Sequence, residues 1–174
     1  MTPTAQRWVV VPYRDGWPAD FEREAAVLRQ VFSGPAAHIK HIGSTAVPGL
    51  GAKPIIDIMV GVGDLAEVAP HIPLLARHGY AYQPDFEAQL PDRRFFHKPA
   101  ARPRTHHLHV VEHDSPFWHD HLAFRDHLRR HPEVAQAYYE LKVQLAAECS
   151  ETGGDYPERK APFIQGVIAR LATD

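Results

Sequence analysis

The chain has 174 residues, and 44% of them are hydrophobic, which is enough for one domain with an ordinary core. A formal net charge of −2 makes no strong case for nucleic acid, and the single cysteine, Cys149, excludes a disulfide framework and a zinc–thiolate site. Because no apolar run is long enough to cross a membrane or to form a signal-peptide core, we expect a cytoplasmic protein.

The first part of the chain alternates predicted helices and strands. Apolar residues recur at helical spacing from Trp17 to Phe32, whereas the run from Lys53 to Val62 is apolar on both faces, as in a central strand. The predicted elements in chain order are a helix at 18–34, strands at 36–42 and 53–62, a helix at 64–80 that Pro70 and Pro73 kink or split, and short strands at 80–83, 93–99 and 105–112.

The rest of the chain is predicted to be helical. Ser115 is a candidate N-cap followed by Pro116, which suits a first helical turn, and three amphipathic segments follow. These helices are expected at 115–130, 132–149 and 156–173. The pattern therefore predicts an α/β (α+β) fold in one domain, residues 1–174, with a mixed β-sheet flanked by helices over about 8–112 and a helical C-terminal part over about 115–172.

The stretch HIGSTAVPGLGAKPIIDIMV, residues 41–60, joins a Gly-Ser turn to a strand that carries one carboxylate. Gly43 permits a tight turn with uncovered backbone N–H groups, and Ser44 can cap a short helical turn or offer its hydroxyl to an oxygen ligand. Asp57 lies among apolar residues, where an ionised group is costly unless it is paired or bound to metal. We expect Gly43 and Ser44 to lie beside Asp57, so that the turn holds phosphate oxygens and the carboxylate holds Mg²⁺.

This motif and several later stretches resemble the GrpB family, also called UPF0157. The later stretches are RRFFHKP, RTHHLHVVEHDSPFW, HLAFRDHLRRHPEVAQAYYELK and the final Y..RKAPFI, so the resemblance extends from about Val10 to Leu171. A Gly-Ser turn followed by a strand carboxylate also resembles the polymerase-β-like nucleotidyltransferase superfamily. The resemblance implies a nucleotidyltransferase-like mixed sheet and leaves the reaction open.

The sequence departs from the superfamily pattern at the second carboxylate. That group is expected two residues after Asp57, where the chain has Met59. Glu112 is the candidate for a further acid, so Asp57 and Glu112 are the predicted catalytic residues and metal ligands. Strand alternation places Glu112 on the opposite face of its strand from His107 and His109, and only one of these faces can line a site.

Basic residues near the motifs are candidates for contacts with phosphate. Lys53, Arg93 and Arg94 could neutralise charge that develops on a phosphoryl group. Lys160, early in the last predicted helix, is a weaker candidate because a solvent-facing lysine is the simpler interpretation.

Nine of the 13 histidines lie between His97 and His131. His107 and His109 share one face of a predicted strand, and this spacing can bind Zn²⁺ or another divalent ion. The simpler alternative is a partly solvated strand whose histidines contact phosphate.

Three functions remain open at this stage. The first is a nucleotidyltransferase that uses Mg²⁺ to move a nucleotidyl group from a nucleoside triphosphate to an unidentified acceptor. The second is a non-catalytic protein that binds a nucleotide or another phosphorylated small molecule, and Met59 favours it. The third is a divalent-metal hydrolase that uses His107 and His109.

Overall fold

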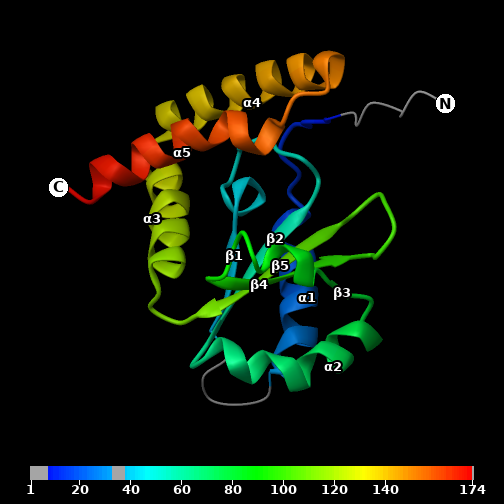
Figure 1. Ribbon diagram of the computed structural model, residues 1–174. Helices are drawn as coiled ribbons and strands as arrows, with labels where there is room; N and C mark the ends of the chain where they lie inside the picture. Colours follow the sequence, from blue (N-terminus) through cyan, green and yellow to red (C-terminus); the bar gives the residue numbers. More distant parts are fainter. Residues whose placement is uncertain (1–7, 33–37, 174) are drawn as a thin grey trace.

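The computed structural model describes residues 8–32 and 38–173, which form a five-stranded sheet surrounded by helices (Figure 1). The helices are α1 (Trp17–Val31), α2 (Ile72–Arg77), α3 (Pro116–Arg130), α4 (Pro132–Thr152) and α5 (Tyr156–Leu171). The strands are β1 (His38–Ile42), β2 (Ile56–Val62), β3 (Ala81–Tyr82), β4 (Arg93–Lys98) and β5 (His106–Glu112). Short 3₁₀ helices are η1 (Ser44–Ala46), η2 (Leu65–His71) and η3 (Pro84–Phe86).

The sheet is mixed, with the strand order β1-β2-β5-β4-β3. The central strands β2 and β5 are parallel, and every other neighbouring pair is antiparallel. The predicted mixed α/β sheet with flanking helices is therefore confirmed. Because β2 and β5 run in the same direction in register, Asp57 of β2 lies beside His107 of β5.

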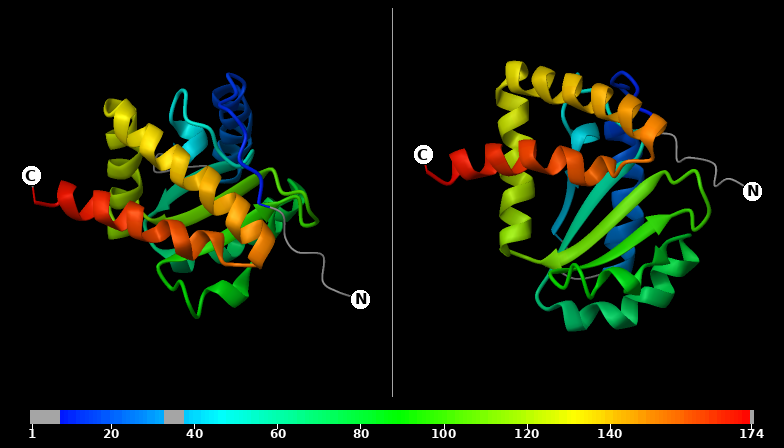
Figure 2. Two further views of the ribbon diagram at one scale, coloured as in Figure 1. Left: turned by 90° about the horizontal axis from the view of Figure 1, so that it is seen from above. Right: turned by 45° about the horizontal axis from the view of Figure 1, so that its top comes forward.

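The two faces of the sheet have different neighbours. Ile58 and Val60 of β2 point to one face and pack with α1 in the main hydrophobic core. Because side chains alternate along a strand, Asp57 of β2 and His107 and His109 of β5 point to the opposite face. Helices α3, α4 and α5 stand on that side, where α4 and α5 run side by side and both cross α3 (Figure 2).

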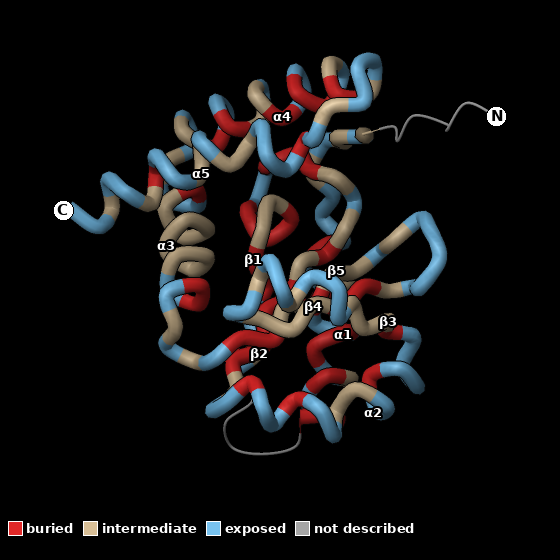
Figure 3. The backbone as a smooth tube through the Cα atoms, in the orientation of Figure 1, coloured by how far each residue is buried: buried red, intermediate tan, exposed pale blue. Residues whose placement is uncertain are grey.

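The buried residues concentrate in the central strands and on the sides of the helices that face them (Figure 3). The connection between β4 and β5, by contrast, is exposed over residues 99–103. Among residues 8–32 and 38–173, none of the helices combines the length and the apolar character that crossing a membrane requires.

The predicted helix at 64–80 is split, as its prolines indicated. Residues Leu65–His71 form the 3₁₀ helix η2, which contains Pro70, and α2 follows from Ile72 to Arg77. The side chain of Asp64 accepts a hydrogen bond of 2.7 Å from the backbone N–H of Ala66 and thereby caps the start of η2.

Other boundaries differ by a few residues from the predicted ones. Strand β2 begins at Ile56 rather than at Lys53, and the predicted strand at 80–83 is reduced to Ala81–Tyr82. Helix α4 continues to Thr152 and ends where Gly153 adopts a positive φ of 74°. The predicted end of the first helix and the start of the strand at 36 fall at residues 33–37, outside the described residues.

The predicted cap of the third long helix is confirmed. The Ser115 side chain accepts a hydrogen bond of 3.3 Å from the backbone N–H of Trp118, and Pro116 opens α3. This cap sets the point at which the chain leaves β5 and begins α3, the helix that covers the side of the sheet on which Asp57 lies. The position of α3 over the sheet therefore follows partly from a local signal in the sequence.

Candidate functional site

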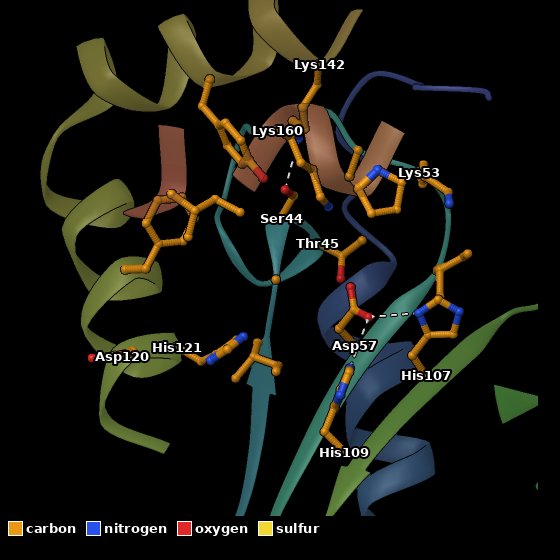
Figure 4. A pocket seen from close by; sticks show the side chains of 18 of the residues that line it. Ser44, Thr45, Lys53, Asp57, His107, His109, Asp120, His121, Lys142 and Lys160 are labelled. Atoms are coloured by element: carbon orange, nitrogen blue, oxygen red, sulfur yellow. Dashed lines mark hydrogen bonds and ion pairs between the residues drawn. The ribbon is translucent and has the colours of Figure 1, made fainter. Parts of the chain in front are cut away.

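A cavity of about 410 Å³ lies between the Asp57 face of the sheet and helices α3, α4 and α5. Its walls come from segments far apart in the chain: the turn after β1, the strands β2, β4 and β5, and one side of each of the three helices. Figure 4 shows that Asp57 lies centrally, with Ser44, Lys142 and Lys160 on one side of it and His109 on the other.

The turn at Gly43 and the Asp57 carboxylate are in close contact. Ile42, the last residue of β1, pairs with Asp57 of β2, so the chain leaves β1 directly beside the carboxylate. Gly43 has φ 71° and ψ −174°, and a Cβ atom placed on it would lie 2.6 Å from Asp57 Oδ2. The predicted proximity of Gly43 and Ser44 to Asp57 is therefore confirmed, and only glycine fits there without strain.

Replacement of Gly43 by alanine should destabilise the protein by about 2 kcal/mol or more, because a side chain at this φ and ψ is strained and the new methyl group collides with Asp57. The measurement is the free energy of unfolding by chemical denaturation. Gly166→Ala is the matched control, since nothing lies within 4 Å of a Cβ at that helical position. An equal effect of both substitutions would contradict the proposed contact.

Ser44 has a partner that the sequence analysis missed. Lys142 of α4 donates hydrogen bonds of 2.9 Å to Ser44 Oγ and 2.5 Å to the carbonyl oxygen of Gly51. The residue is only 2% exposed. Ser44 therefore does not act as a side-chain cap of η1, as the sequence had suggested, and presents its hydroxyl to the lysine instead.

A signal for Lys142 was present in the sequence. On α4 it follows Tyr138 by four residues and precedes Leu145 by three, so it belongs to the buried stripe of the helix. A lysine in an otherwise apolar stripe is a candidate for a functional group, because a buried ammonium is costly without a partner.

Asp57 is held between two histidines of β5. His107 Nδ1 lies 3.2 Å from Asp57 Oδ1, and His109 Nε2 lies 4.0 Å from the same oxygen (Figure 4). Burial opposes ionisation of this carboxyl, but the neighbouring ring nitrogens of His107 and His109 favour the ionised form more strongly and hold the pKa of Asp57 well below its usual range. The carboxylate is therefore ionised, and its 30% exposed side chain opens to the cavity.

Three lysines converge on the same cavity. Burial, reinforced by the charge of Lys160, lowers the pKa of Lys142 to about 7 and that of Lys53 to about 8. Burial also lowers the pKa of Lys160 itself. The ammonium of Lys53 lies 4.3 Å from the ring centre of Trp8, and that of Lys160 lies 5.4 Å from the ring centre of Tyr156. The cavity thus gathers three lysines beside the carboxylate of Asp57.

The structure brings together most of the predicted site residues. Those that line the cavity are Gly43, Ser44, Lys53, Asp57, Arg93, His107, His109 and Lys160. Lys160 is turned into the cavity rather than toward solvent, so the simpler interpretation of that residue was wrong (Figure 4).

Two predicted residues lie elsewhere. Arg94 points to the opposite face of β4 and lies 3.4 Å from Glu87 in an ion pair. Glu112 is exposed at the last position of β5, beside Val62, whereas Asp57 pairs near the start of the strand. Glu112 is therefore too far along the strand, and on the wrong face, to share a metal ion with Asp57.

Met59 occupies the position expected for the second carboxylate, and it is fully buried. It packs in a small hydrophobic cluster with Ile42, Val111, Phe117 and Trp118, between the sheet and α3. Met59 thus helps to pack α3 against the sheet, and its position does not face a metal ion beside Asp57.

Histidine clustering does not produce a metal site of several protein ligands. Among the residues that the structure describes, no three His, Cys, Asp or Glu side chains are grouped so as to hold a metal ion. His107 and His109 instead both turn a ring nitrogen to Asp57. The arrangement fits neutralisation and orientation of the carboxylate better than a zinc centre with several histidine ligands.

The fold and cavity define an α/β protein whose cavity gathers several lysines beside the ionised carboxylate of Asp57. Residues 7–170 match the family described as GrpB protein, and the chain belongs to this family. It is 34% identical to the conserved protein GrpB from Enterococcus faecalis, whose crystal structure superimposes with a TM-score of 0.82 over 94% of this chain and 99% of that one.

Two relatives differ in the share of their own length that the match covers. The glutamate-rich protein GrpB of Alkalihalophilus pseudofirmus is 32% identical over 94% of this chain and 95% of its own length. The UPF0157 protein YqkA of Bacillus subtilis is 36% identical over 90% of this chain, but the match covers only 45% of that protein. The chain thus spans about half the length of the Bacillus relative.

Proposed function

We propose that the cavity binds a phosphate-bearing small molecule, with a nucleoside triphosphate and one Mg²⁺ as the leading candidate. The observation that carries this proposal is the convergence of Lys53, Lys142 and Lys160 on the Gly43–Ser44 turn and Asp57. Buried cations are costly without an opposite charge. A polyphosphate would supply that charge, and the Ser44 hydroxyl and the lysines would donate hydrogen bonds to its oxygens.

Asp57 fits Mg²⁺ by the chemistry of its donors. It offers ionised carboxylate oxygens, which Mg²⁺ prefers, and Mg²⁺ is commonly bound by one or two carboxylates together with substrate phosphates. In this proposal Asp57 holds the ion and the phosphates complete its coordination. The metal would polarise a phosphoryl oxygen, while the lysines hold the phosphates and the two histidines orient the carboxylate.

The resemblance to nucleotidyltransferases suggests transfer of a nucleotidyl group, but two-metal transfer depends on several carboxylates. Position 59 is a buried methionine, and Glu112 lies at the other end of the paired strands from Asp57. Asp57 is therefore the predicted acidic residue that can bind a metal ion in the cavity. Binding without transfer is therefore the second candidate function, and the buried Met59 favours it. Release of pyrophosphate from ATP in the presence of Mg²⁺ would identify transfer, with water taking the nucleotidyl group where no other acceptor is added.

Asp57→Asn should weaken the binding of ATP about tenfold or more when Mg²⁺ is present, because the ion loses its protein ligand. Without Mg²⁺ the same substitution should leave the affinity unchanged or raise it, because it removes a negative charge beside the phosphates. Isothermal titration calorimetry with and without Mg²⁺ measures both effects, and thermal melting of each protein checks the fold.

Glu112→Gln is the control, because Glu112 is the other predicted metal ligand and lies outside the cavity. It should leave both affinities as in the wild type. If Glu112→Gln abolished the effect of Mg²⁺ while Asp57→Asn did not, the assignment of the metal to Asp57 would be wrong.

A further inference from the structure

The cavity extends beyond Asp57 to a second end, away from the lysines. Along β5 the pairing with β4 places His107 beside His97, His109 beside Phe95, and Val111 beside Arg93. Arg93 therefore lies at the far end of this face. Helix α3 adds His121 to the cavity wall (Figure 4). We call Arg93, His109 and His121, with the adjacent rings of Phe95 and Phe117, the arginine end of the cavity.

Arg93 is a half-buried cation without a hydrogen-bond partner for its Nε atom. Nε is inaccessible to solvent, and within residues 8–32 and 38–173 no acceptor reaches it. The guanidinium carbon lies 4.6 Å from the ring centre of Phe117, and burial lowers the pKa of Arg93 despite the charge of neighbouring Asp92. The adjacent Arg94 has an ion pair with Glu87 instead. A guanidinium in this situation lacks the anion that would normally accompany it.

One histidine of the arginine end presents a hydrogen-bond acceptor to the cavity. His121 Nδ1 donates to the carbonyl oxygen of Phe117 at 2.9 Å, and burial lowers the pKa of His121 to about 4, so Nε2 of the neutral ring is an acceptor. His109 turns Nε2 toward Asp57 Oδ1 at 4.0 Å, and its Nδ1 is inaccessible to solvent and without a partner in the described structure.

The rings around these groups restrict the size of what can bind. The ring centre of Phe117 lies 3.7 Å from that of His121 and 5.8 Å from that of His109, and Phe95 lies 5.1 Å from His109. Asp120, next to His121, adds a carboxylate to the cavity wall. The arginine end thus combines one unpaired cationic donor with several acceptors inside an aromatic surround.

We propose that the arginine end binds a second ligand, a small carboxylic acid that carries a hydroxyl or ammonium group on the carbon next to the carboxylate. The carboxylate accepts from Arg93, and the neighbouring hydroxyl or ammonium donates to His121 Nε2 or Asp120. This inference deepens the proposed function, because it names the chemical class of the molecule that shares the cavity with the phosphate-bearing ligand. The inference rests on the proposed function in one respect only, namely that the carboxylic acid shares the cavity with a phosphate-bearing ligand.

The test is a titration of the full chain, followed by the NMR signals of the Arg93 side-chain N–H and the His121 ring, with propionate, lactate and alanine as probes. These three carboxylates have similar size and differ in the group next to the carboxylate. Lactate or alanine should bind about threefold to tenfold more tightly than propionate, because each adds a hydrogen bond to a buried acceptor. A stronger effect of lactate identifies a hydroxyl, and a stronger effect of alanine identifies an ammonium.

Arg93→Met should reduce the affinity for the preferred probe about tenfold or more, since it removes the charged donor. Arg94→Met is the matched control: it alters the same strand at the next position, outside the cavity, and should have no effect. Equal binding of all three carboxylates by the wild type, which requires no variant to fold, would overturn the proposal. Equal losses in the two arginine variants would overturn it as well.

Tripolyphosphate distinguishes this inference from the proposed function. Lactate or alanine should still bind when tripolyphosphate is saturating, because the lysines and Arg93 lie at different ends of the cavity. Competition between the two would overturn the inference by assigning Arg93 to the phosphates. Failure of tripolyphosphate to bind the wild type would overturn the proposed function, whereas discrimination among the three carboxylates would still support the second site.

Discussion

Met59→Asp is expected to lower the free energy of unfolding by about 4 kcal/mol or more, since it buries an unpaired carboxylate in place of a core side chain. Met59 is fully buried and packs with Ile42, Val111, Phe117 and Trp118, so a carboxylate at this position would lie among apolar side chains. The loss should be larger at neutral than at acidic pH, because burial favours the protonated form of the new carboxyl. Chemical denaturation at a neutral and at an acidic pH measures the loss in the free energy of unfolding.

The same substitution tests whether the sequence motif of nucleotidyltransferases maps onto β2. If position 59 faced the metal, Mg²⁺ would protect Met59→Asp more than the wild type. The packing of Met59 beneath α3 predicts instead that Mg²⁺ changes the melting temperatures of both proteins equally. Met59→Leu, which conserves the volume of the side chain, should cost less than about 1.5 kcal/mol. A Mg²⁺-dependent rescue of Met59→Asp would show that this region opens to the cavity.

The part of the site that could be predicted from the sequence is the part encoded locally. Gly43, Ser44 and Asp57 belong to one stretch of the chain, and the turn between the two strands is too short to separate them. Strand alternation then placed His107 and His109 together on one side of β5 and Glu112 on the other. The sequence alone could not decide which side faces Asp57, because that depends on the register between β2 and β5.

The missing half of the site comes from helices distant in sequence. Lys142 lies 98 residues after Ser44, and its contact with that residue depends on how α4 crosses the end of the sheet. The turn of Lys160 into the cavity likewise depends on the packing of α5 beside α4. Similarly, Arg93 and Arg94 are adjacent in sequence, and only the pairing of β4 with β5 assigns one to the cavity and the other to Glu87.

Without an anionic ligand, the wild-type protein should become more stable as the pH rises from about 7.5 to 9.5. In the folded state the pKa of Lys142 is lowered by burial to about 7 and that of Lys53 to about 8, whereas both titrate near 10.5 when unperturbed. In this range the unfolded chain therefore binds more protons than the folded protein. The free energy of unfolding must then increase with pH, and the cost of burying charged lysines is fully present only below these lowered pKa values.

Lys142→Met should remove about half of this pH dependence, because Lys142 and Lys53 contribute comparably over this range. The slope that remains belongs to Lys53 and Lys160, whose pKa values burial also lowers. Chemical denaturation across the pH range measures the slope for each protein. Lys40→Met is the control, since Lys40 is exposed on β1 and its loss should leave the slope unchanged. If the free energy of unfolding of the wild type were constant or fell between pH 7.5 and 9.5, Lys142 would not be a buried lysine with a lowered pKa, and the assignment would be contradicted.

The affinity for polyphosphate should follow the opposite trend with pH. Protonated lysines attract phosphate oxygens and neutral ones do not, so tripolyphosphate should bind the wild type more weakly at pH 9.5 than at pH 7.5. Lys142→Met should bind it about tenfold or more weakly at pH 7.5 and show a smaller change with pH, because hydrogen bonds to charged groups contribute more than neutral ones. Bound tripolyphosphate should also flatten the stability curve of the wild type, since it supplies the charge that the protonated lysines lack. Calorimetric titration at the two pH values measures the affinity. Equal affinities of wild type and Lys142→Met would mean that the Lys142–Ser44 contact is structural only.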